Sequence, residues 1–586
     1  MHLVSPEDLL SANKNLKYFG GKVTARLLLR LLGFNKLNKG YELNYKYEKT
    51  EFLDKIIEHF GLKYELLEDD LKKIPAKGPF IIISNHPTGA GEGIFLIKLF
   101  SELRPDFKFL TNFLLNRIEP MKGYFLPVNP FEDRKDMQSS MAGIKCALEH
   151  VKNGAPLGIF PAGEVSAYQK GKREVTDREW LPVVLKLIRK AKVPVIPVYV
   201  EARNSSMFYF LGKINPLLRT VKLPSELLNK TNTIYKLRIG APISVSEQDQ
   251  FKDISEYGDF LRMKTYTLGR KVKKKSKSNG DISEKIINEV PQDLIKSEVE
   301  KLTDENLLFN LENYKVFHAK ADKIPNILRE IGRLRELTYR EVGEGTGKSI
   351  DIDRFDSWYN HLFIWDVEAQ CIVGAYRMGK GKELLEHDGV KGFYLQSLFK
   401  FNEKFFPTLE KSIELGRSFI RKEYQRKTLS LFLLWKGILY FLIKHPEYRY
   451  LIGPVSISDA FSDFSKGLIV EFLKANCLNE ELMRYVTPRK EFEYNLADHI
   501  DINVFLKYIG NDIGKLDKFI HDVEPEQRIP VLFKKYIKQN ARIIGFNVDP
   551  KFNYCLDVIM LLDLQDVPQE VIESLSKEAS DTVIVF

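Results

Sequence analysis

Residues 81–93 read Ile-Ile-Ile-Ser-Asn-His-Pro-Thr-Gly-Ala-Gly-Glu-Gly and decide how the first half of the chain folds. The apolar run predicts a buried strand that ends at Asn85-His86, and Pro87 keeps His86 out of a helical conformation. The glycines allow a tight turn, after which Glu92 returns a carboxylate. We expect Glu92 to fix one tautomer of His86 and to raise its basicity. The alternative is a histidine that only packs against this turn.

Three further segments repeat the pattern of an apolar strand followed by a turn. They are residues 123–130 (Gly-Tyr-Phe-Leu-Pro-Val-Asn-Pro), 157–166 (Leu-Gly-Ile-Phe-Pro-Ala-Gly-Glu-Val-Ser) and 193–204 (Val-Pro-Val-Ile-Pro-Val-Tyr-Val-Glu-Ala-Arg-Asn). Together with residues 81–93 they resemble, in order, the motifs of the PlsC-type glycerolipid acyltransferases. The nearest form is a subgroup with Asn-His-Pro-x-Gly-x-x-Asp-Gly. The resemblance implies an αβα domain in which His86 deprotonates an acceptor hydroxyl and Glu92 orients His86.

The same resemblance assigns the residues that bind the acceptor. They are Asn85, Gly163, Glu164, Ser166 and, in place of an arginine missing from the second motif, Arg134. The chain departs from the subgroup at Glu92, where Asp is usual. The extra methylene of Glu still lets its carboxylate reach the ring.

Length and composition agree with a multidomain enzyme. The chain has 586 residues, 44% of them hydrophobic and 12% aromatic, which is too long for one core and too apolar for disorder. Four scattered cysteines form neither a disulfide framework nor a metal-ligand spacing, so we expect no metal. The longest apolar run, 429–443, contains Lys436 and is shorter than the roughly 20 residues that span a bilayer.

The net charge of +10 predicts an anionic partner. Basic residues alternate with leucines over 16–32 at helical spacing, which is typical of a helix lying on a membrane surface. Packing of this helix on its own domain is an equal alternative. No nucleic-acid-binding motif is present. We therefore expect peripheral binding to the cytoplasmic face of a bacterial inner membrane.

A basic run at 270–277 interrupts the apolar periodicity and predicts a linker between domains. The expected organisation is basic amphipathic helices at 1–45, an O-acyltransferase domain at 46–262, a linker at 263–300 and a second α/β domain at 301–586. The tail from 485 onward is kept with the second domain because it ends in two strand-like runs.

Beyond the linker, a helical pattern at 324–341 precedes a glycine-rich loop and a series of strands. The most specific segment is Glu414-Leu415-Gly416-Arg417-Ser418. This order resembles the GNAT-like fold, and more narrowly the ornithine-lipid or hemolysin-like N-acyltransferases. The resemblance covers about residues 315–565.

The resemblance implies roles for five polar residues of the second domain. Glu414 is the candidate base or polar anchor, and the candidate substrate-binding residues are Arg417, Ser418, Asp353 and Asp356. A structural ion pair between Glu414 and Arg417 is the alternative. Residues 421–428 contain no glycine to hold a pyrophosphate, so acyl carrier protein is favoured over CoA as carrier of the acyl donor.

Two acyltransferase types in one chain predict a two-step synthesis of an aminolipid, and no bound cofactor is expected. The second domain would N-acylate an amino acid with a 3-hydroxyacyl thioester, and the first would O-acylate the resulting lyso-lipid. Two alternatives remain open. One is a lysophospholipid or 1-acylglycerol-3-phosphate O-acyltransferase with an accessory C-terminal domain, and the other is a non-catalytic scaffold at the membrane surface.

Overall fold

The computed structural model describes most of the chain. Nothing is described for residues 1–3, 8–9, 11–20, 129–136, 170–173, 215, 232, 271–282, 426–427, 497–499, 551, 553 and 571–586. The predicted acceptor residue Arg134 and most of the basic run at 270–277 therefore lie outside the described residues. The chain forms two compact units, the first comprising 1–271 and 497–508 and the second 272–496 and 509–586.

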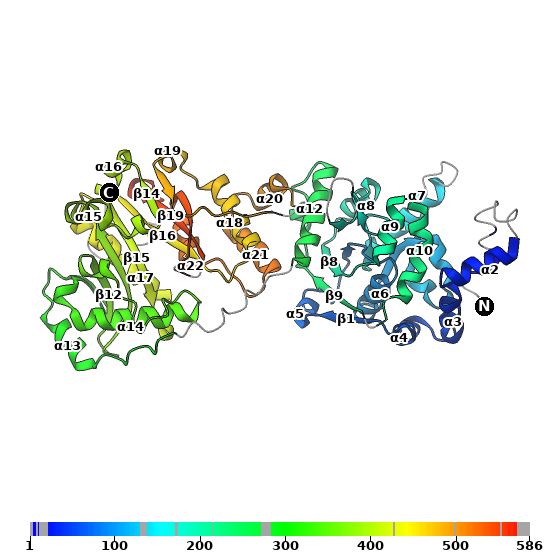
Figure 1. The fold of residues 1–586 in the computed structure, drawn as a ribbon, viewed down its shortest axis with the longest axis horizontal. Helices are drawn as coiled ribbons and strands as arrows, with labels where there is room; N and C mark the ends of the chain where they lie inside the picture. The colour runs from blue at the N-terminus through cyan, green and yellow to red at the C-terminus, as the bar shows by residue number, and fades with distance from the viewer. Residues whose placement is uncertain are drawn as a thin grey trace. The chain divides into compact units, whose positions relative to one another are not determined.

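The described residues of unit 1 form a seven-stranded sheet in the order β1-β9-β8-β2-β5-β3-β4. Figure 1 labels β1, β8 and β9 of this sheet and several of the helices that cover it. The strands are β1 (Lys63–Leu66), β2 (Ile81–Ser84), β3 (Lys108–Asn112), β4 (Phe125–Val128), β5 (Leu157–Ile159), β8 (Val195–Glu201) and β9 (Ile234–Ile239). Neighbouring strands run parallel except β8 and β9. Strand β2 is central and buried over its whole length, as expected for an apolar strand covered on both faces.

Helices pack around this sheet. They are α2 (Gly21–Leu31), α3 (Phe34–Asn44), α4 (Lys49–Phe60), α5 (Glu68–Leu71), α6 (Gly91–Leu103), α7 (Met137–Lys152), α8 (Pro182–Ala191), α9 (Ser206–Ile214), α10 (Pro216–Leu228), α11 (Val245–Gln248) and α12 (Ile254–Tyr266). Two minor strands, β6 (Ala167–Tyr168) and β7 (Val175–Thr176), pair beside the sheet. The carboxyl end of β2 carries the His86 turn, and α6 begins directly after it.

Unit 2 is built on an eight-stranded sheet, counted over the residues that the structure describes, in the order β10-β11-β12-β13-β15-β16-β19-β18. The strands are β10 (Leu307–Leu311), β11 (Tyr314–Lys320), β12 (Asn360–Asp366), β13 (Cys371–Lys380), β15 (Ser412–Ile420), β16 (Tyr450–Ile457), β18 (Arg542–Asp549) and β19 (Cys555–Asp563). Strands β15 and β16 are parallel and pair only over Ser412–Glu414 with Tyr450–Ile452. Beyond these residues the two strands separate.

Helices cover both faces of the second sheet. They are α13 (Gln292–Lys301), α14 (Pro325–Glu341), α15 (Gly381–Asp388), α16 (Phe406–Glu410), α17 (Thr428–Lys444), α18 (Asp463–Asn476), α19 (Glu480–Met483), α21 (Ile513–Val523) and α22 (Val531–Lys538), with a strand pair β14 (Phe399–Phe401) and β17 (Val486–Pro488). Helix α14 packs against Phe317 and Phe363, whereas α17 packs against Val316 and Leu362 on the opposite face. The predicted α/β class of both domains is confirmed.

The segment boundaries differ from the expected ones in two places. Residues 263–266 complete α12, where Met263 is buried, and 292–301 form α13, so the helices of both units extend into the expected linker. Helix α20 (Ile502–Ile509), expected to belong to the second domain, packs largely with unit 1, where the Tyr508 hydroxyl donates to Glu247 at 2.8 Å. Hydrophobic periodicity cannot reveal which core such a returning helix joins.

No described helix combines the length and the apolar character that crossing a bilayer requires.

Candidate active sites

His86 and Glu92 form the centre of the first candidate site. His86 lies at the carboxyl end of β2, and its Nδ1 is 2.9 Å from Oε1 of Glu92 in the first turn of α6. Glu92 is fully buried, whereas the His86 side chain keeps 15% of its surface exposed. The buried Glu92 carboxylate therefore contacts Nδ1 of His86, and Nε2 is the ring nitrogen that remains to accept a proton from the substrate.

Glu92 is held as a carboxylate. Burial alone would raise its pKa, but His86, the Thr88 hydroxyl and the Gly89 N–H together lower it to about 2. The N–H groups of Thr88 and Gly89 both donate to Oε1 at 2.8 Å, and the Thr88 hydroxyl donates to Oε2. Gly89 has φ of +100°, a conformation that L side chains rarely adopt, so the turn that supplies these donors needs glycine.

The His86 ring is also fixed from the side. It stacks on Phe160 with ring centroids 3.9 Å apart and planes at 20°. Phe160 follows β5 and opens the Phe-Pro-Ala-Gly-Glu segment, so the first and third motifs meet at this contact. The stacked ring and the carboxylate together restrict the imidazole to one orientation.

Asn85 and Ser166 have roles that differ from the predicted acceptor binding. The Asn85 side chain exchanges two hydrogen bonds with the backbone of Val200, at 3.0 and 2.8 Å, and so joins β2 to β8. The Ser166 hydroxyl donates to Asp177 at 2.5 Å, and its N–H donates to the His86 carbonyl at 2.8 Å. Both side chains are buried, so they support the His86 backbone rather than face a substrate.

Asp177 and Asn204 complete the support of this loop and were missed by the sequence analysis. Asp177 is fully buried and accepts the His86 N–H at 3.2 Å. Burial raises the pKa of Asp177. The Asn204 amide donates to the carbonyls of Pro87 and Thr88 at 3.5 and 3.4 Å. Asn204 ends the motif segment 193–204 without having been assigned a role, and Asp177 lies outside the motifs.

Glu164 lies beside two arginines at the turn after Phe160. Its carboxylate is 3.5 Å from Nε of Arg178 and 3.2 Å from Nη2 of Arg219. Glu164 is 41% exposed and remains accessible to an acceptor. Gly163 has φ of +68°, and a Cβ there would lie 2.7 Å from Leu181, so this glycine shapes the turn. The arginine pair places positive charge beside Glu164.

Glu414 in unit 2 is a buried anchor. Its carboxylate accepts hydrogen bonds from the Tyr359 hydroxyl and from the N–H groups of Tyr394 (3.1 Å) and Leu395 (2.8 Å). Burial raises its pKa to about 7, although these donors oppose the shift. Because every contact is internal, the structure favours the predicted role of polar anchor over that of base.

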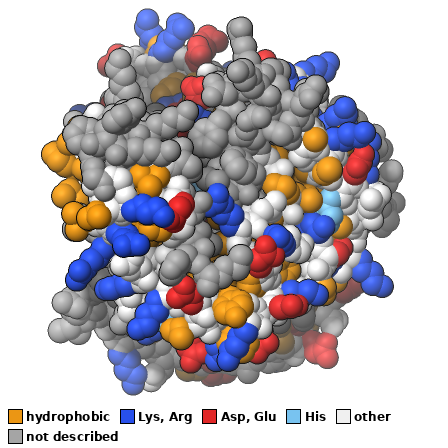
Figure 2. Space-filling view, turned by 90° about the vertical axis from the view of Figure 1, so that its right-hand side faces the viewer, with side chains coloured by type: hydrophobic (Ala, Val, Ile, Leu, Met, Phe, Trp, Pro, Cys, Tyr) orange, Lys and Arg blue, Asp and Glu red, His pale blue; other side chains and the backbone are white. Residues whose placement is uncertain are grey.

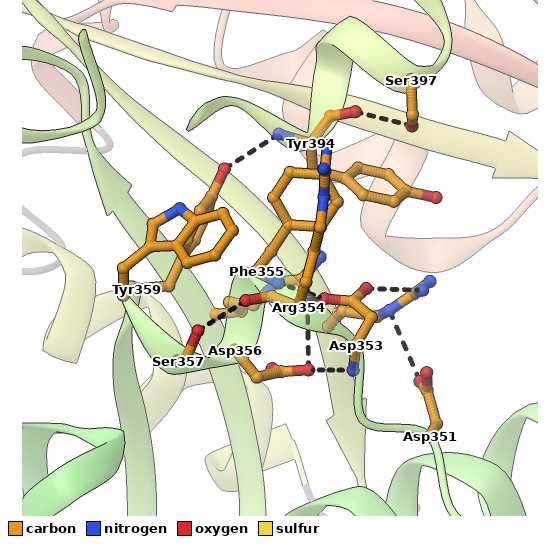
Figure 3. Close-up of polar contacts among 12 residues, drawn as sticks. Asp351, Asp353, Arg354, Phe355, Asp356, Ser357, Tyr359, Tyr394 and Ser397 are labelled. Carbon is orange, nitrogen blue, oxygen red and sulfur yellow. Dashed lines mark hydrogen bonds and ion pairs between the residues drawn. The ribbon is translucent and has the colours of Figure 1, made fainter. Parts of the chain in front are cut away.

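Arg417 lies three residues after Glu414 on β15, where the regular pairing of β15 with β13 is interrupted. Its φ of +52° is unusual for a residue with a side chain. The guanidinium is 3.4 Å from Asp351 and 3.3 Å from Asp353, two residues labelled in Figure 3. It lies over the rings of Tyr394 and Phe552 at 5.2 and 5.1 Å. The ion pairs are long and the aromatic contacts are close, so Arg417 is held in place while part of its hydrogen-bonding capacity stays available.

Asp356 belongs to a buried charge network instead of the predicted substrate site. It pairs with Arg335 at 2.7 Å and with Arg377 at 3.3 Å. Its Oδ2 accepts the Asp353 N–H (Figure 3). Arg377 also donates to Asp353 at 2.7 Å. Asp353 is thereby placed between Arg377 and Arg417, and Asp356 fixes the loop that carries it.

A cleft opens where β15 and β16 separate. It is narrow, with a volume of about 60 Å³. Its lining includes Gly416, Arg417, Ser418, Gly453, Val455 and Tyr536. Strand edges that diverge expose backbone N–H and C=O groups, which can pair with an extended amide-containing chain such as the arm of an acyl thioester. The predicted residues Arg417 and Ser418 thus lie at a cavity, although the Ser418 carbonyl already accepts the Tyr339 hydroxyl at 2.9 Å.

The folds and sites define a two-domain acyltransferase, and comparison with known proteins agrees. Residues 12–274 match the family described as "Acyltransferase", and residues 334–436 match the "Acetyltransferase (GNAT) domain". One part of the chain is therefore of the O-acyl-transfer type and the other of the N-acyl-transfer type.

Particular relatives narrow this class. The chain is 30% identical over 283 residues to a "Glycine N(alpha)-acyltransferase" of Bacteroides thetaiotaomicron, covering 46% of this chain and 77% of that protein. It therefore belongs to the same family as that enzyme. It is also 24% identical over 275 residues to a "Lyso-glycine lipid O-acyltransferase" of Phocaeicola vulgatus, covering 45% of this chain and 95% of that protein.

A solved structure is similar to part of the chain. It is the 1-acyl-sn-glycerophosphate (LPA) acyltransferase PlsC from Thermotoga maritima, with 16% identity, a TM-score of 0.24, and coverage of 42% of this chain and 86% of that one.

Proposed function

We propose that this chain makes a glycine lipid by two consecutive acyl transfers. Unit 2 would join a 3-hydroxyacyl group to the amine of glycine, and unit 1 would esterify the resulting hydroxyl with a second acyl group. The choice of glycine is supported by the names of relatives that match the chain. The observation that carries the proposal is the presence in one chain of two compact units, each with its own candidate site.

In unit 1, His86 is the proposed base for the hydroxyl of the lyso-lipid. Glu92, with a pKa of about 2, stays negative at any physiological pH and stabilises the imidazolium that forms when Nε2 accepts the proton. The alkoxide attacks the thioester carbonyl, and the proton held by His86 passes to the departing thiolate. Arg178 and Arg219 are the proposed partners of the glycine carboxylate. Both arginines contact Glu164, and the carboxylate of the substrate can take the place of Glu164 in these contacts.

In unit 2, the cleft between β15 and β16 is the proposed site of the acyl thioester, with Arg417 binding the carboxylate of glycine. A planar guanidinium stacked between two rings is suited to one fixed carboxylate geometry. We propose acyl carrier protein as the carrier of the acyl donor, because residues 421–428 lack the glycines that would cradle the pyrophosphate of CoA.

We also propose that unit 1 binds the surface of an anionic membrane, at the cytoplasmic face of the inner membrane. Met207, Phe210 and Ile214 share one face of α9 and are all exposed by more than half. Buried Tyr209 of the same helix accepts the Asn204 N–H at 3.0 Å, and Asn204 holds the His86 turn. A lipid that enters along α9 would therefore arrive beside the catalytic imidazole.

Helix α2 adds a second exposed segment with the same character. Val23 and Leu27 are 73% and 56% exposed, while Ala25 and Leu29 are buried, so the helix both packs on its domain and presents apolar side chains. Its exposed basic residues include Lys22, Arg26 and Arg30. Figure 2 faces the end of unit 1 that carries α2 and shows apolar side chains among Lys and Arg. Such a mixture suits an anionic interface.

The test is reconstitution with purified protein. Glycine and a 3-hydroxyacyl thioester should yield N-acylglycine, and a second acyl thioester should convert it to the diacylated lipid, both identified by mass spectrometry. Replacing glycine by ornithine or by lysophosphatidic acid should give much less product. Transfer to lysophosphatidic acid without transfer to any amino acid would refute the proposal.

A further inference from the structure

An unusual carboxylate lies on the sheet of unit 2 and is not part of any motif. Asp557 on β19 pairs with Ser456 on β16 and is 3% exposed. The Ser456 hydroxyl donates to its Oδ1 at 2.6 Å. Its Oδ2 is buried and has no hydrogen-bond partner among the described residues. A buried carboxylate oxygen without a partner is costly, and such a group in an enzyme commonly awaits a ligand.

The surroundings of Asp557 connect it to Arg417. Side chains alternate along a strand, so Ser456 and Asp557 face the opposite side of the sheet from the cleft-lining Met560 and Leu562, on the side where Ile559 and Leu561 pack with Phe355 and Tyr359. Burial raises the pKa of Tyr394 to about 12, and the nearby charge of Asp557 acts in the same direction. The Tyr394 ring lies 5.2 Å from the Arg417 guanidinium. Asp557 and Arg417 therefore both lie close enough to Tyr394 for their opposite charges to act on its hydroxyl.

Glu344, in the loop after α14, adds a second carboxylate. Burial raises the pKa of Glu344 to about 7, and the charge of Asp557 contributes to that shift. Burial likewise raises the pKa of Asp557 to about 7, with Asp549 of β18 acting in the same direction and the Ser456 hydroxyl opposing it. The side chain of Asn547 and the thiol of Cys555, which donates to Oδ1 at 3.9 Å, also act to lower the pKa of Asp557. Glu344 is half-buried and Asp557 is buried, and two carboxylates that act on each other in this way favour the arrival of a cation.

We infer that Asp557, with Glu344 beside it, binds the ammonium group of the amino acid and accepts its proton during N-acyl transfer. This inference rests on the proposed function of unit 2. An amino acid carries one carboxylate and one ammonium group, and the charges of Arg417 and Asp557, which both act on Tyr394, are of the matching signs. Glu414, the base suggested by the motif, already receives three hydrogen bonds and has no comparable unpartnered oxygen.

The proton balance follows from this placement. The ammonium nitrogen gives one proton to the Asp557 carboxylate, and the free amine attacks the thioester carbonyl. The C–S bond breaks, and the thiolate takes the second proton of the nitrogen and leaves as a thiol. The third hydrogen remains on the amide. Asp557 then releases its proton to solvent. A base with a pKa near the working pH performs this exchange best.

The experiment compares Asp557→Asn with wild type in N-acyl transfer to glycine from pH 6 to pH 9. Wild-type kcat/KM should rise with pH through about 7 as Asp557 ionises. The variant should be about 10²-fold slower near pH 7, a typical loss for a missing base, and should recover at high pH where free amine is abundant. Asp563→Asn, a change on the same strand at a residue paired with Arg449, is the matched control and should leave the profile unchanged.

Ser456→Ala provides a second test that does not remove the carboxylate. The Ser456 hydroxyl lowers the pKa of Asp557, so its loss should move the rising limb of the profile to higher pH. Thermal unfolding of each variant identifies any that fail to fold. Wild-type rates for Asp557→Asn at every pH, an equal loss at every pH, or an unmoved limb in Ser456→Ala would overturn the inference. A wild-type chain that acylates no amine would instead refute the proposed function itself.

Discussion

The two candidate sites differ in how the chain assembles them. In unit 1 the central pair, His86 and Glu92, comes from one turn between a strand and a helix, and their side chains meet at 2.9 Å. In unit 2 the polar groups of the candidate site come from separate strands and loops, from Asp351 to Asp557. A site made by one turn can be read from a short motif, whereas a site made by strand pairing depends on the register of the whole sheet.

The largest expected effect distinguishes the reaction of unit 1 from the reaction of unit 2. His86→Ala should reduce O-acyl transfer by roughly 10²–10⁴-fold, because the hydroxyl loses its base, and should leave N-acyl transfer unchanged. Mass spectrometry of the products should then show N-acylglycine accumulating at the expense of the diacylated lipid. His150→Ala, which alters a partly buried histidine on α7, is the control. A normal yield of diacylated lipid from His86→Ala would remove His86 from the mechanism.

A second change tests whether Glu414 is an anchor. Its pKa is raised from 4.5 to about 7 in the folded chain, so between these values the unfolded chain ionises while the folded chain stays neutral. Wild-type stability should therefore fall as pH rises from about 4.5 to about 7, by at most about 3 kcal/mol. Glu414→Gln should lose this part of the pH dependence and keep N-acyl transfer within about tenfold.

Chemical denaturation at pH 5 and pH 8 measures this difference. Glu330→Gln, a change at another buried glutamate, which pairs with Arg333 at 2.5 Å, serves as the control. If wild type and Glu414→Gln lose the same stability between the two pH values, Glu414 is ionised in the fold and the anchor account is wrong. If Glu414→Gln abolishes N-acyl transfer while folding normally, Glu414 is a base.

The smallest expected effect concerns only unit 1 and its membrane surface. Phe210→Ser on α9 should weaken binding to vesicles that contain anionic phospholipid by about tenfold, since one apolar side chain contributes roughly 1.5–3 kcal/mol at most when buried. Cosedimentation measures the binding. Leu103→Ser, at an exposed leucine at the end of α6, is the matched control and should bind normally. Equal binding by Phe210→Ser and wild type would exclude α9 from the interface.

The sequence predicted the parts of each site that depend on local pattern. The strand before His86, the returning Glu92 and the strands of the second sheet follow from apolar runs and turn residues. The roles of Asn85 and Ser166 could not be derived in this way, because both bind partners that only the folded sheet brings near, Val200 and Asp177. A motif states which residues are present and does not state which way each side chain points.

The sequence did not indicate the roles of the residues that reach each site from distant segments. Asn204 reaches the His86 turn across more than a hundred residues of chain, and Asp557 lies within an apolar strand where a lone carboxylate reads as an irregularity. Its position near Tyr394 depends on the pairing of β16 with β19. Helix α20 is a further example, because its apolar periodicity predicts a helix but does not indicate which of the two units the helix joins.

The central claim is that one chain performs both transfers at separate sites, and a mixing experiment tests it most directly. Purified His86→Ala should form only N-acylglycine, and purified Arg417→Ala should form neither product from glycine but should O-acylate added N-(3-hydroxyacyl)glycine. Mixed together, the two proteins should restore the diacylated lipid. Diacylated lipid from either variant alone, or none from the mixture, would contradict the account.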